Sequence, residues 1–381
     1  MPFLTYARQY CLDHFSALNH ELRFWHTSAT KMLFAAEVIV ALALAVWVSE
    51  KLGLHFAWWA ALSSFAVTKA TPKESSVRAL QRLLGTIVGG CFGLLATVVV
   101  LPYVDVAFLL CGLIGGYTVY RANESPWSYA WLLGAVTAMM VIIDAQSVSS
   151  FPVVVRFTLS RISEVAVGIS MCLVTGFVFH WISTLLNLAG DKSPAATASV
   201  IVVSESEWRS KRILLGVEAG IAVFIVALIL WQANISDLSQ ALVTVIAISV
   251  LPAGKNTPET NTQIIDRMVQ RLVGCLLAGI LGILLLPVLH GSAWLYILAL
   301  TAGLWLGCHL QQGSDNVSYT GRQFTIAWIM IFIQPHYWSA DPHVALQRFY
   351  GIILGVLMLA IIMLLVRVLK AHLRHRLRVK P

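Results

Sequence analysis

Two glutamates lie inside apolar stretches of the sequence, where ionised side chains are rare. Glu37 and Glu218 each stand about five or six residues into such a stretch, a depth of roughly 7–9 Å in a helix. A carboxylate at this depth requires an ion-pair partner, water or a proton. We therefore take Glu37 and Glu218 as candidates for proton coupling. The alternative is that they form structural ion pairs with Arg82 and Arg271.

Four arginines at the ends of apolar stretches have the chemistry to bind anions. The planar guanidinium group matches a carboxylate with two parallel hydrogen bonds. Arg82 and Arg271 begin two equivalent stretches on one side, and Arg161 and Arg348 begin two others on the opposite side. This placement indicates an anion path that is entered past the first pair and left past the second. Anchoring at the membrane interface is the alternative.

Polar and aromatic residues cluster before two further apolar stretches. Non-helical polar backbone inside a membrane is tolerated only where it lines a cavity. At that depth the clusters would bind substrate, whereas as plain cytoplasmic loops they need no such role. Trp58 and Trp59 have the rings to stack on an aromatic substrate, or to anchor the chain at the interface. The binding candidates in the clusters are Asn123, Tyr129, Asn316 and Tyr319.

Patterns typical of enzymes do not occur in the sequence. The six cysteines form no CxxC pair, the histidines lack metal-ligand spacing, and no Ser/His/Asp nucleophile pattern is found. Gly254-Lys255-Asn256-Thr257 resembles part of a P-loop but lacks its first glycine. We therefore expect no enzyme activity, no cofactor, no metal and no direct use of ATP.

The composition explains why these charges matter. Of 381 residues, 58% are hydrophobic and 12% are charged, and the mean hydropathy is +0.79. A soluble domain of this size cannot cover so much apolar surface. The sequence therefore predicts an all-α integral membrane protein and excludes a soluble or nucleic-acid-binding one. The net charge of +8 then reports basic cytoplasmic loops rather than a nucleic-acid partner.

A membrane-spanning helix needs about 20 mostly apolar residues. All but four of the 26 Lys and Arg residues fall on the side of the N-terminus, which predicts two cytoplasmic termini. Residues 1–31 are polar and aromatic, with no short apolar core and no cleavage site, so we expect no signal peptide. Three of the predicted spans are short or polar: 54–70, 238–253 and 318–334. The twelve predicted spans are 32–50, 54–70, 79–101, 103–120, 127–144, 161–183, 212–232, 238–253, 270–289, 293–311, 318–334 and 345–369.

Internal similarity indicates two tandem six-helix repeats. Gln270–Gly274 resembles Gln81–Gly85, and the glutamates and helix-start arginines recur at matching places. Six is an even number, so both repeats have the same orientation, with a pseudo-two-fold axis along the membrane normal. The predicted organisation is an interfacial or cytoplasmic segment (1–31), the first repeat (32–187), a cytoplasmic linker (188–210), the second repeat (211–369) and a basic cytoplasmic tail (370–381).

Small residues recur at a spacing of four in both repeats. This spacing places them on one helix face, where they allow close helix packing. The alternative is that this face lines the seam through which substrate passes. The residues are Gly85, Gly89 and Gly93 in the first repeat and Gly274, Ala278 and Gly282 in the second.

The segments Phe56–Leu62, Thr71-Pro72 and Arg82–Gly89 resemble the fusaric acid resistance and aromatic acid exporter family of bacterial inner-membrane proteins. The second copy, Arg271–Cys275, resembles it less. The resemblance implies proton-driven export of aromatic carboxylic acids. Some members work beside a periplasmic membrane-fusion subunit, which makes such a subunit a candidate partner. Longer members carry sizeable cytoplasmic domains after each half, whereas here the linker and tail are short.

We therefore expect an exporter of small organic anions in the bacterial inner membrane. Its partners would be the anion, protons, the lipid bilayer and, as candidates, a periplasmic subunit and a second copy of the chain. Two alternatives stay open: a passive organic-anion channel, which needs no proton carrier, and a membrane scaffold that transports nothing.

Overall fold

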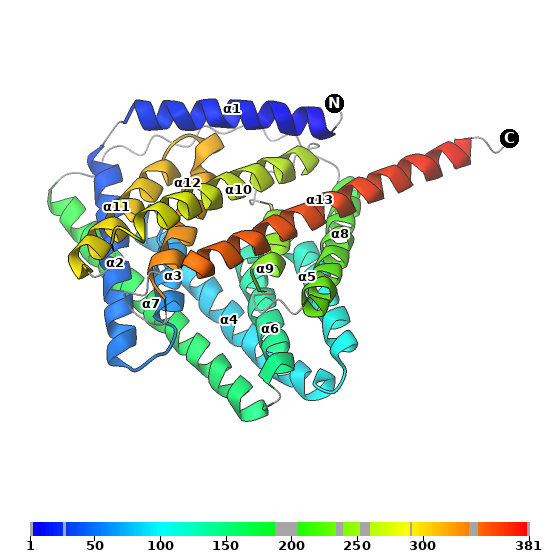
Figure 1. Cartoon of the computed structure of the whole chain (residues 1–381), viewed down its shortest axis with the longest axis horizontal. Coiled ribbons are helices and arrows are strands. Elements are labelled where there is room, and N and C mark those ends of the chain that lie inside the picture. Colours follow the sequence, from blue (N-terminus) through cyan, green and yellow to red (C-terminus); the bar gives the residue numbers. More distant parts are fainter. Residues whose placement is uncertain are drawn as a thin grey trace. The chain divides into compact units, whose positions relative to one another are not determined.

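The computed structural model of the chain describes residues 3–25, 28–148, 150–186, 205–233, 239–251, 260–289, 292–334 and 342–378. Within these ranges all regular structure is helical (Figure 1). The helices are α1 (Phe3–Arg23), α2 (Ala29–Lys51), α3 (Ala57–Val67), α4 (Pro72–Val100), α5 (Val104–Ala122), α6 (Ser128–Val148), α7 (Phe151–Leu185), α8 (Glu205–Gln232), α9 (Ser239–Ser249), α10 (Thr260–Leu285), α11 (Ala293–Gln311), α12 (Asp315–Phe332) and α13 (Pro342–Arg378).

Nine helices in the described part of the chain are long and apolar enough to cross a membrane, as an all-α integral membrane protein requires. Each of the twelve predicted spans falls on one of the helices α2–α13. Three of these helices, α3, α9 and α12, are not among the nine. The spans 54–70 and 238–253 contain α3 and α9, which have 11 residues each. Such a helix is only about 16 Å long and cannot cross a core of about 30 Å alone.

Several helices extend beyond the predicted spans and into the predicted connecting segments. Helix α7 begins at Phe151, ten residues before the predicted span 161–183. Helix α8 begins at Glu205, inside the predicted linker 188–210, while residues 187–204 lie outside the described residues. The predicted tail is helical as far as Arg378, the last residue of α13. Because a helix can continue past the bilayer, the span and domain boundaries stay predictions.

The chain divides into two compact units, and each unit takes helices from both halves of the sequence. Unit 1 comprises Met1–Thr86, Arg156–Ser199 and Glu259–Phe349, and unit 2 comprises Ile87–Val155, Val200–Pro258 and Tyr350–Pro381. In unit 1, α2 packs against α3 and α11, and α10 and α11 both pack against α12. In unit 2, α5 packs against α6 and α8, and α9 contacts both α6 and α8.

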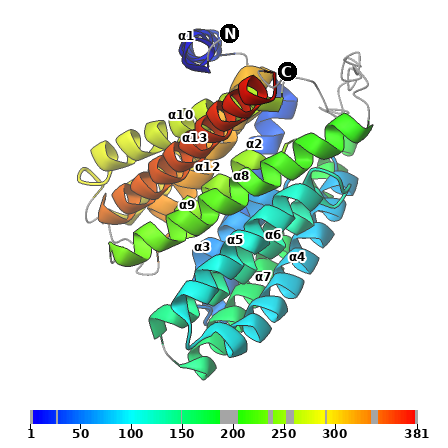
Figure 2. The same ribbon diagram turned by 90° about the vertical axis from the view of Figure 1, so that its right-hand side faces the viewer.

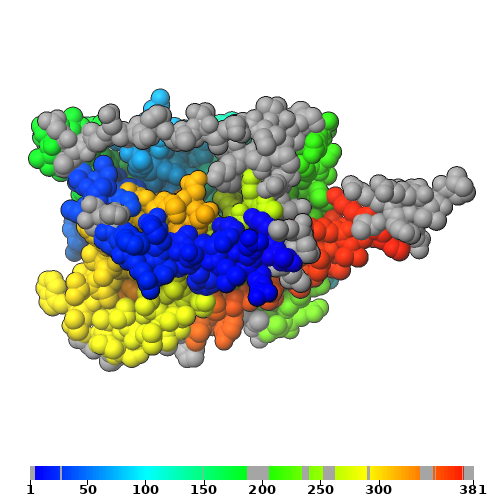
Figure 3. All heavy atoms as spheres, turned by 90° about the horizontal axis from the view of Figure 1, so that it is seen from above, coloured from blue at the N-terminus to red at the C-terminus, as the bar shows by residue number. Residues whose placement is uncertain are grey.

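Helix α1 lies across α10 and α12 of unit 1 and stands uncovered on the face shown in Figure 3. Tyr6, Tyr10, His14 and Leu18 follow at intervals of four, so they share one helix face. Leu18 packs in an apolar cluster with residues of α10, α11 and α12. The predicted N-terminal segment therefore contains a helix, and that helix buries one face against unit 1.

Helices α5 and α8 run side by side in opposite directions through unit 2 (Figure 2). Their glycines are paired: a Cβ atom on Gly112 would lie 2.9 Å from the carbonyl oxygen of Gly220, and one on Gly116 would lie 2.8 Å from that of Gly216. Only glycine permits such close backbone approach.

Candidate functional site

Arg161 is the most deeply buried arginine at the candidate site. It lies on α7 in unit 1, and 2% of its surface is exposed. Its guanidinium carbon stands 3.5 Å from the centre of the Trp59 ring on α3. A cation over the face of an indole is attracted by the ring's quadrupole, more strongly when both groups are desolvated. The tryptophan therefore holds the guanidinium in place.

A second buried arginine acts on the first. Arg82 of α4 is 5% exposed. Of the neighbouring charges, that of Arg82 has the largest electrostatic effect on Arg161. Two buried like charges repel each other in a medium of low dielectric constant. The carboxylate of Glu164 is the other charge that acts on Arg161, so two arginines and one carboxylate determine the electrostatics of this part of unit 1.

The carboxylate closest along α7 is engaged elsewhere. Oε1 of Glu164 accepts hydrogen bonds from the backbone N–H of Phe56 and the hydroxyl of Ser160, both at 2.9 Å. These bonds fix the residue that precedes α3. Among the described residues, no hydrogen bond reaches Nε or Nη1 of Arg161. An unsatisfied buried donor is unfavourable by about 1–3 kcal/mol, and more when it is charged.

Arg161 lies well inside α7. Because α7 begins at Phe151, Arg161 lies ten residues, or about 15 Å, along the helix. The sequence placed it at the start of a span, on the outer face, and since α7 has 35 residues, more than a bilayer requires, that placement stays a prediction. Its counterpart Arg348 lies on α13, but its side chain is outside the described residues.

The matching arginine of the second half has a protein partner. Nη1 of Arg271 on α10 donates to Oε1 of Gln323 on α12 at 2.7 Å. One turn earlier, the Arg267 guanidinium stands 5.0 Å from the ring centre of Tyr319. Helix α1 adds further polar contacts to α10, because Tyr6 donates to Asp266 and Gln270 donates to Tyr10. This α10–α12 region is therefore more fully hydrogen-bonded than the surroundings of Arg161.

The two glutamates lie in different units. Glu37 of unit 1 faces α7, with Oε1 3.1 Å from the place of a Cβ atom on Gly176. Glu218 of unit 2 is 4% exposed, and the charges of Lys370 and Arg367 on α13 act on it. The expected pairs with Arg82 and Arg271 therefore remain predictions.

The side-chain amide of Asn123, a residue expected to bind substrate, forms hydrogen bonds with backbone groups. Nδ2 donates to the carbonyl oxygens of Val119 and Ser249, at 2.8 and 3.0 Å. Oδ1 accepts from the N–H of Leu251 at 2.8 Å. The bonds to Ser249 and Leu251 connect Asn123 to the end of α9. Asn316 is exposed on the first turn of α12, and Tyr129 is half-buried on α6.

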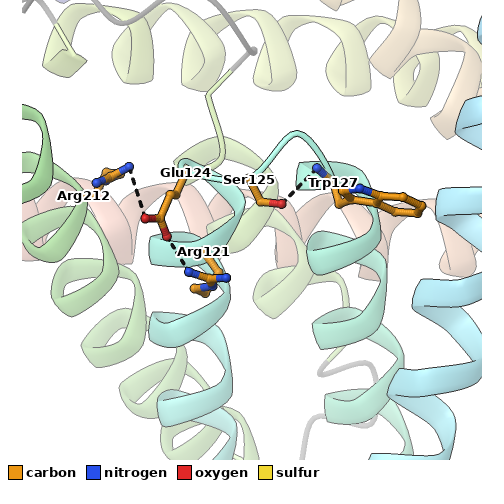
Figure 4. Close-up of polar contacts among 5 residues, drawn as sticks. All are labelled: Arg121, Glu124, Ser125, Trp127 and Arg212. Atoms are coloured by element: carbon orange, nitrogen blue, oxygen red, sulfur yellow. Dashed lines mark hydrogen bonds and ion pairs between the residues drawn. The ribbon is translucent and has the colours of Figure 1, made fainter. Parts of the chain in front are cut away.

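Charged side chains close the loop around Asn123 (Figure 4). Nη1 of Arg121 donates to Oε2 of Glu124 at 2.6 Å, and the other carboxylate oxygen lies 3.8 Å from Nη1 of Arg212 on α8. The Trp127 N–H donates to the Ser125 hydroxyl at 3.1 Å. This predicted polar cluster is thus an ion-paired connection between α5, α6 and α8 within unit 2.

The small residues meet other helices closely. A Cβ atom on Gly89 would clash with the backbone of Gly134 on α6, and one on Gly93 would lie 2.9 Å from Cβ of Val141. On α10, a Cβ atom on Gly274 would lie 2.5 Å from the carbonyl oxygen of Thr320, and one on Gly282 would lie 3.0 Å from Ile331. These contacts join α4 to α6 and α10 to α12.

Sequence reasoning missed two arginines that meet at the end of α3. Arg78 and Arg322 both donate to the carbonyl oxygen of Ala66, from α4 and α12 respectively. Arg78 precedes Arg82 by four residues, just as Arg267 precedes Arg271. This repeated spacing was the available signal.

Comparisons with known proteins show the family to which the chain is similar. The family model described as "Fusaric acid resistance protein-like" matches residues 41–175 and 256–363, more than half of the chain. A p-hydroxybenzoic acid efflux pump subunit AaeB from Musicola paradisiaca is 32% identical over 154 residues, which are 36% of this chain and 23% of that protein. The AaeB protein of an Escherichia coli strain is 25% identical over 180 residues, 44% and 26% of the two chains.

The chain thus spans about a quarter of the length of these curated relatives. No solved structure matches it. Since the family model covers segments from both halves, including all of α3, α4 and α10, the assignment does not depend on one motif. The chain belongs to the fusaric acid resistance protein-like family.

Proposed function

We propose that the chain is a membrane transporter that exports small organic anions, and that aromatic carboxylates are its substrates. The observation that carries this proposal is Arg161, a buried cation with two nitrogens that no described residue satisfies. A carboxylate would accept charge-assisted hydrogen bonds from these nitrogens, which are about twice as strong as neutral ones. The names of the relatives, p-hydroxybenzoic acid efflux pump subunits, support the aromatic class.

The neighbours of Arg161 give the proposed site its selectivity for charge. Arg82 adds a second positive charge, and Trp59 fixes the direction in which Arg161 donates. A bound carboxylate offsets the repulsion between the two arginines. Arg271 and Arg348 are the corresponding positions proposed for the second half.

Transport direction and energy source are further parts of the proposal. The relatives are named efflux pumps, and we assign this chain to the bacterial inner membrane with both termini in the cytoplasm. Glu37 and Glu218 are the proposed proton carriers, since each places a carboxylate inside a long apolar helix. A periplasmic membrane-fusion subunit and a second copy of the chain are the proposed protein partners.

We also propose that α2–α7 and α8–α13 are tandem six-helix repeats. The helix lengths support this: α3 and α9 both have 11 residues, and α5 and α11 both have 19. The packing pairs support it too, because α5 packs on α8 in unit 2 as α11 packs on α2 in unit 1. Each repeat would thus exchange helices with the other.

Flux of labelled p-hydroxybenzoate into or out of proteoliposomes tests the function, with a pH gradient and a voltage imposed separately. We expect accumulation against the substrate gradient only when the pH gradient is present. Arg161→Gln should abolish it. Arg156→Gln is the matched control, because Arg156 lies on the same helix but is exposed.

The two alternatives give different results in the same assay. A passive channel would conduct along voltage and concentration alone, and a Glu37→Gln/Glu218→Gln double variant would keep that conductance. A scaffold would show no flux of any organic anion. Unchanged flux in Arg161→Gln would contradict the proposed binding site.

A further inference from the structure

Three cationic side chains lie close to the short connection between α3 and α4 in unit 1. Lys69 lies in this short connection. Nε of Arg78 on α4 and Nη2 of Arg322 on α12 donate to the carbonyl oxygen of Ala66, at 2.9 and 3.0 Å. Since both nitrogens bond to one oxygen, they are no farther apart than the two bonds combined.

The end of α3 explains why the arginines converge there. The last four carbonyl groups of a helix lack partners within it, and together they carry a partial negative charge of about half an electron. Ala66 is the second-last residue of α3. Two full positive charges therefore meet at one partial negative charge, and both act on the neighbouring Lys69.

Other groups lie around the connection between α3 and α4. Glu74, an exposed residue in the first turn of α4, is the one carboxylate among the charges acting on Lys69. On α7, Cys172 contacts the Thr68 hydroxyl at 3.3 Å. On α2, Glu37 faces Gly176 of α7.

The backbone fixes Lys69 beside the arginines. Its N–H donates to the hydroxyl of Ser75 at 2.9 Å, and the Thr68 hydroxyl donates to the carbonyl oxygen of Ser64 at 2.9 Å. Lys69 itself is half-buried, as are Arg78 and Arg322, whereas the next residue, Ala70, is exposed. The cluster can therefore be reached from its Ala70 side.

We propose that Lys69, Arg78 and Arg322 form a second anion-binding site, which takes a carboxylate group and binds it together with a proton on Lys69. The inference rests on the proposed function, because it makes the transported class of anion the ligand. A carboxylate has two oxygens and about four acceptor positions, enough for an ammonium group and two guanidinium groups. The site is separate in composition from Arg161, Arg82 and Trp59.

The charge state of Lys69 links binding to pH. Burial, together with the neighbouring charges of Arg322 and Arg78, lowers the pKa of Lys69 to about 7. Above that pH the empty site holds Lys69 neutral. A bound carboxylate favours the ammonium form, so the complex holds one more proton than the empty site. Affinity for the anion should then fall as the pH rises above 7, by at most about tenfold per pH unit.

Calorimetric titration of the full chain in lipid nanodiscs with p-hydroxybenzoate, at pH 6 and pH 8.5, tests the linkage. The wild type should bind more than tenfold more weakly at the higher pH. Lys69→Arg keeps the positive charge and should bind equally at both. Lys69→Met should bind at pH 6 as weakly as the wild type does at pH 8.5. Lys73→Arg and Lys73→Met are matched controls, because Lys73 is an exposed lysine four residues away, in the first turn of α4.

A second measurement separates this inference from the proposed function. Lysines are methylated with ¹³C, the Lys69 signal is identified by its loss in Lys69→Arg, and its titration is followed with and without formate, the smallest carboxylate. Formate should raise the midpoint of Lys69. An unchanged midpoint, or a wild-type pH profile in Lys69→Arg, would overturn the inference. A raised midpoint without p-hydroxybenzoate binding at any pH would instead overturn the proposed substrate class.

Discussion

The guanidinium carbon of Arg161 lies 3.5 Å from the centre of the Trp59 ring. Nε and Nη1 of the same side chain donate no hydrogen bond to any described residue. Arg161 is thus fixed in place but not satisfied. A side chain arranged in this way lowers the stability of the empty protein and becomes favourable when an anion binds.

The first prediction concerns this conflict between stability and binding. Arg161→Met replaces a buried charge with an apolar side chain of similar length and removes two buried donors that lack a described acceptor, each unfavourable by about 1–3 kcal/mol. We expect Arg161→Met to unfold at a higher temperature than the wild type without ligand. It should also lose the stabilisation that p-hydroxybenzoate gives the wild type.

Thermal unfolding in detergent, with and without p-hydroxybenzoate, measures both effects. Arg156→Met should change the unfolding free energy by less than about 0.5 kcal/mol, because Arg156 is exposed. A large loss of stability in Arg161→Met would show that a partner satisfies Arg161 in the empty protein.

A second prediction concerns the glycine contacts between α5 and α8. In Gly116→Ala the new methyl group would lie 2.8 Å from the carbonyl oxygen of Gly216, closer than real Cβ contacts. The two backbones must separate, so we expect a loss of about 1–3 kcal/mol in unfolding free energy. Gly279→Ala is the control, since a Cβ atom there meets nothing within 4 Å and alanine favours the helix.

Unfolding by a denaturing detergent compares the two variants. Equal stabilities for Gly116→Ala and Gly279→Ala would show that α5 and α8 pack less closely than described.

The positions of the helices were predictable from the sequence, because apolar stretches long enough to span a bilayer are plain in composition alone. Their ends were less so. Arg161 was placed at the start of a span, whereas α7 begins ten residues earlier, at Phe151, because a buried arginine on an aromatic ring is compatible with a helix. By contrast, the end of α3 at Val67 is encoded locally, because the apolar stretch gives way to Thr68-Lys69-Ala70-Thr71 and Pro72 begins the next helix. The meeting of Arg78 and Arg322 at Ala66 depends on the fold.

The candidate site was predictable by residue type more than by arrangement. Arg161 and Trp59 were both identified, but as separate features, because 102 positions of sequence separate them and only the fold brings them together. Asn123 was predicted to bind substrate, and that role stays a prediction. The structure shows that its amide also completes a tertiary contact with the end of α9, which depends on packing rather than on its own sequence neighbours.

The third prediction tests this contact. Asn123→Ala removes two hydrogen bonds to the end of α9 and leaves the Leu251 N–H and the Ser249 carbonyl without this partner. Each group left unsatisfied is unfavourable by about 1–3 kcal/mol. We expect faster amide hydrogen exchange at residues 249–251 and lower stability, with anion affinity unchanged.

Hydrogen exchange followed by mass spectrometry measures the local effect. Asn316→Ala is the control, because Asn316 is exposed. Anion affinity that fell with Asn123→Ala while exchange stayed the same would return Asn123 to the role of a binding residue.

The last prediction follows from Lys69 and concerns stability rather than binding. Its pKa is about 7 in the folded protein against an ordinary value of 10.5, so between these values the unfolded chain binds more protons than the folded one. Stability without an anion should therefore rise as the pH increases from 7 towards 10.5, and the penalty for burying the charged lysine should be fully present below pH 7.

Lys69→Met removes the titrating group and should flatten this part of the profile, with a gain in stability at pH 6, whereas Lys73→Met should retain the wild-type slope. The free energy of unfolding in mixed detergent micelles, determined from pH 6 to pH 10, provides the comparison. A wild-type profile that falls over this range, or one that Lys69→Met leaves unchanged, would mean that Lys69 keeps its proton in the folded protein and that an acceptor near Ala66 already offsets its charge.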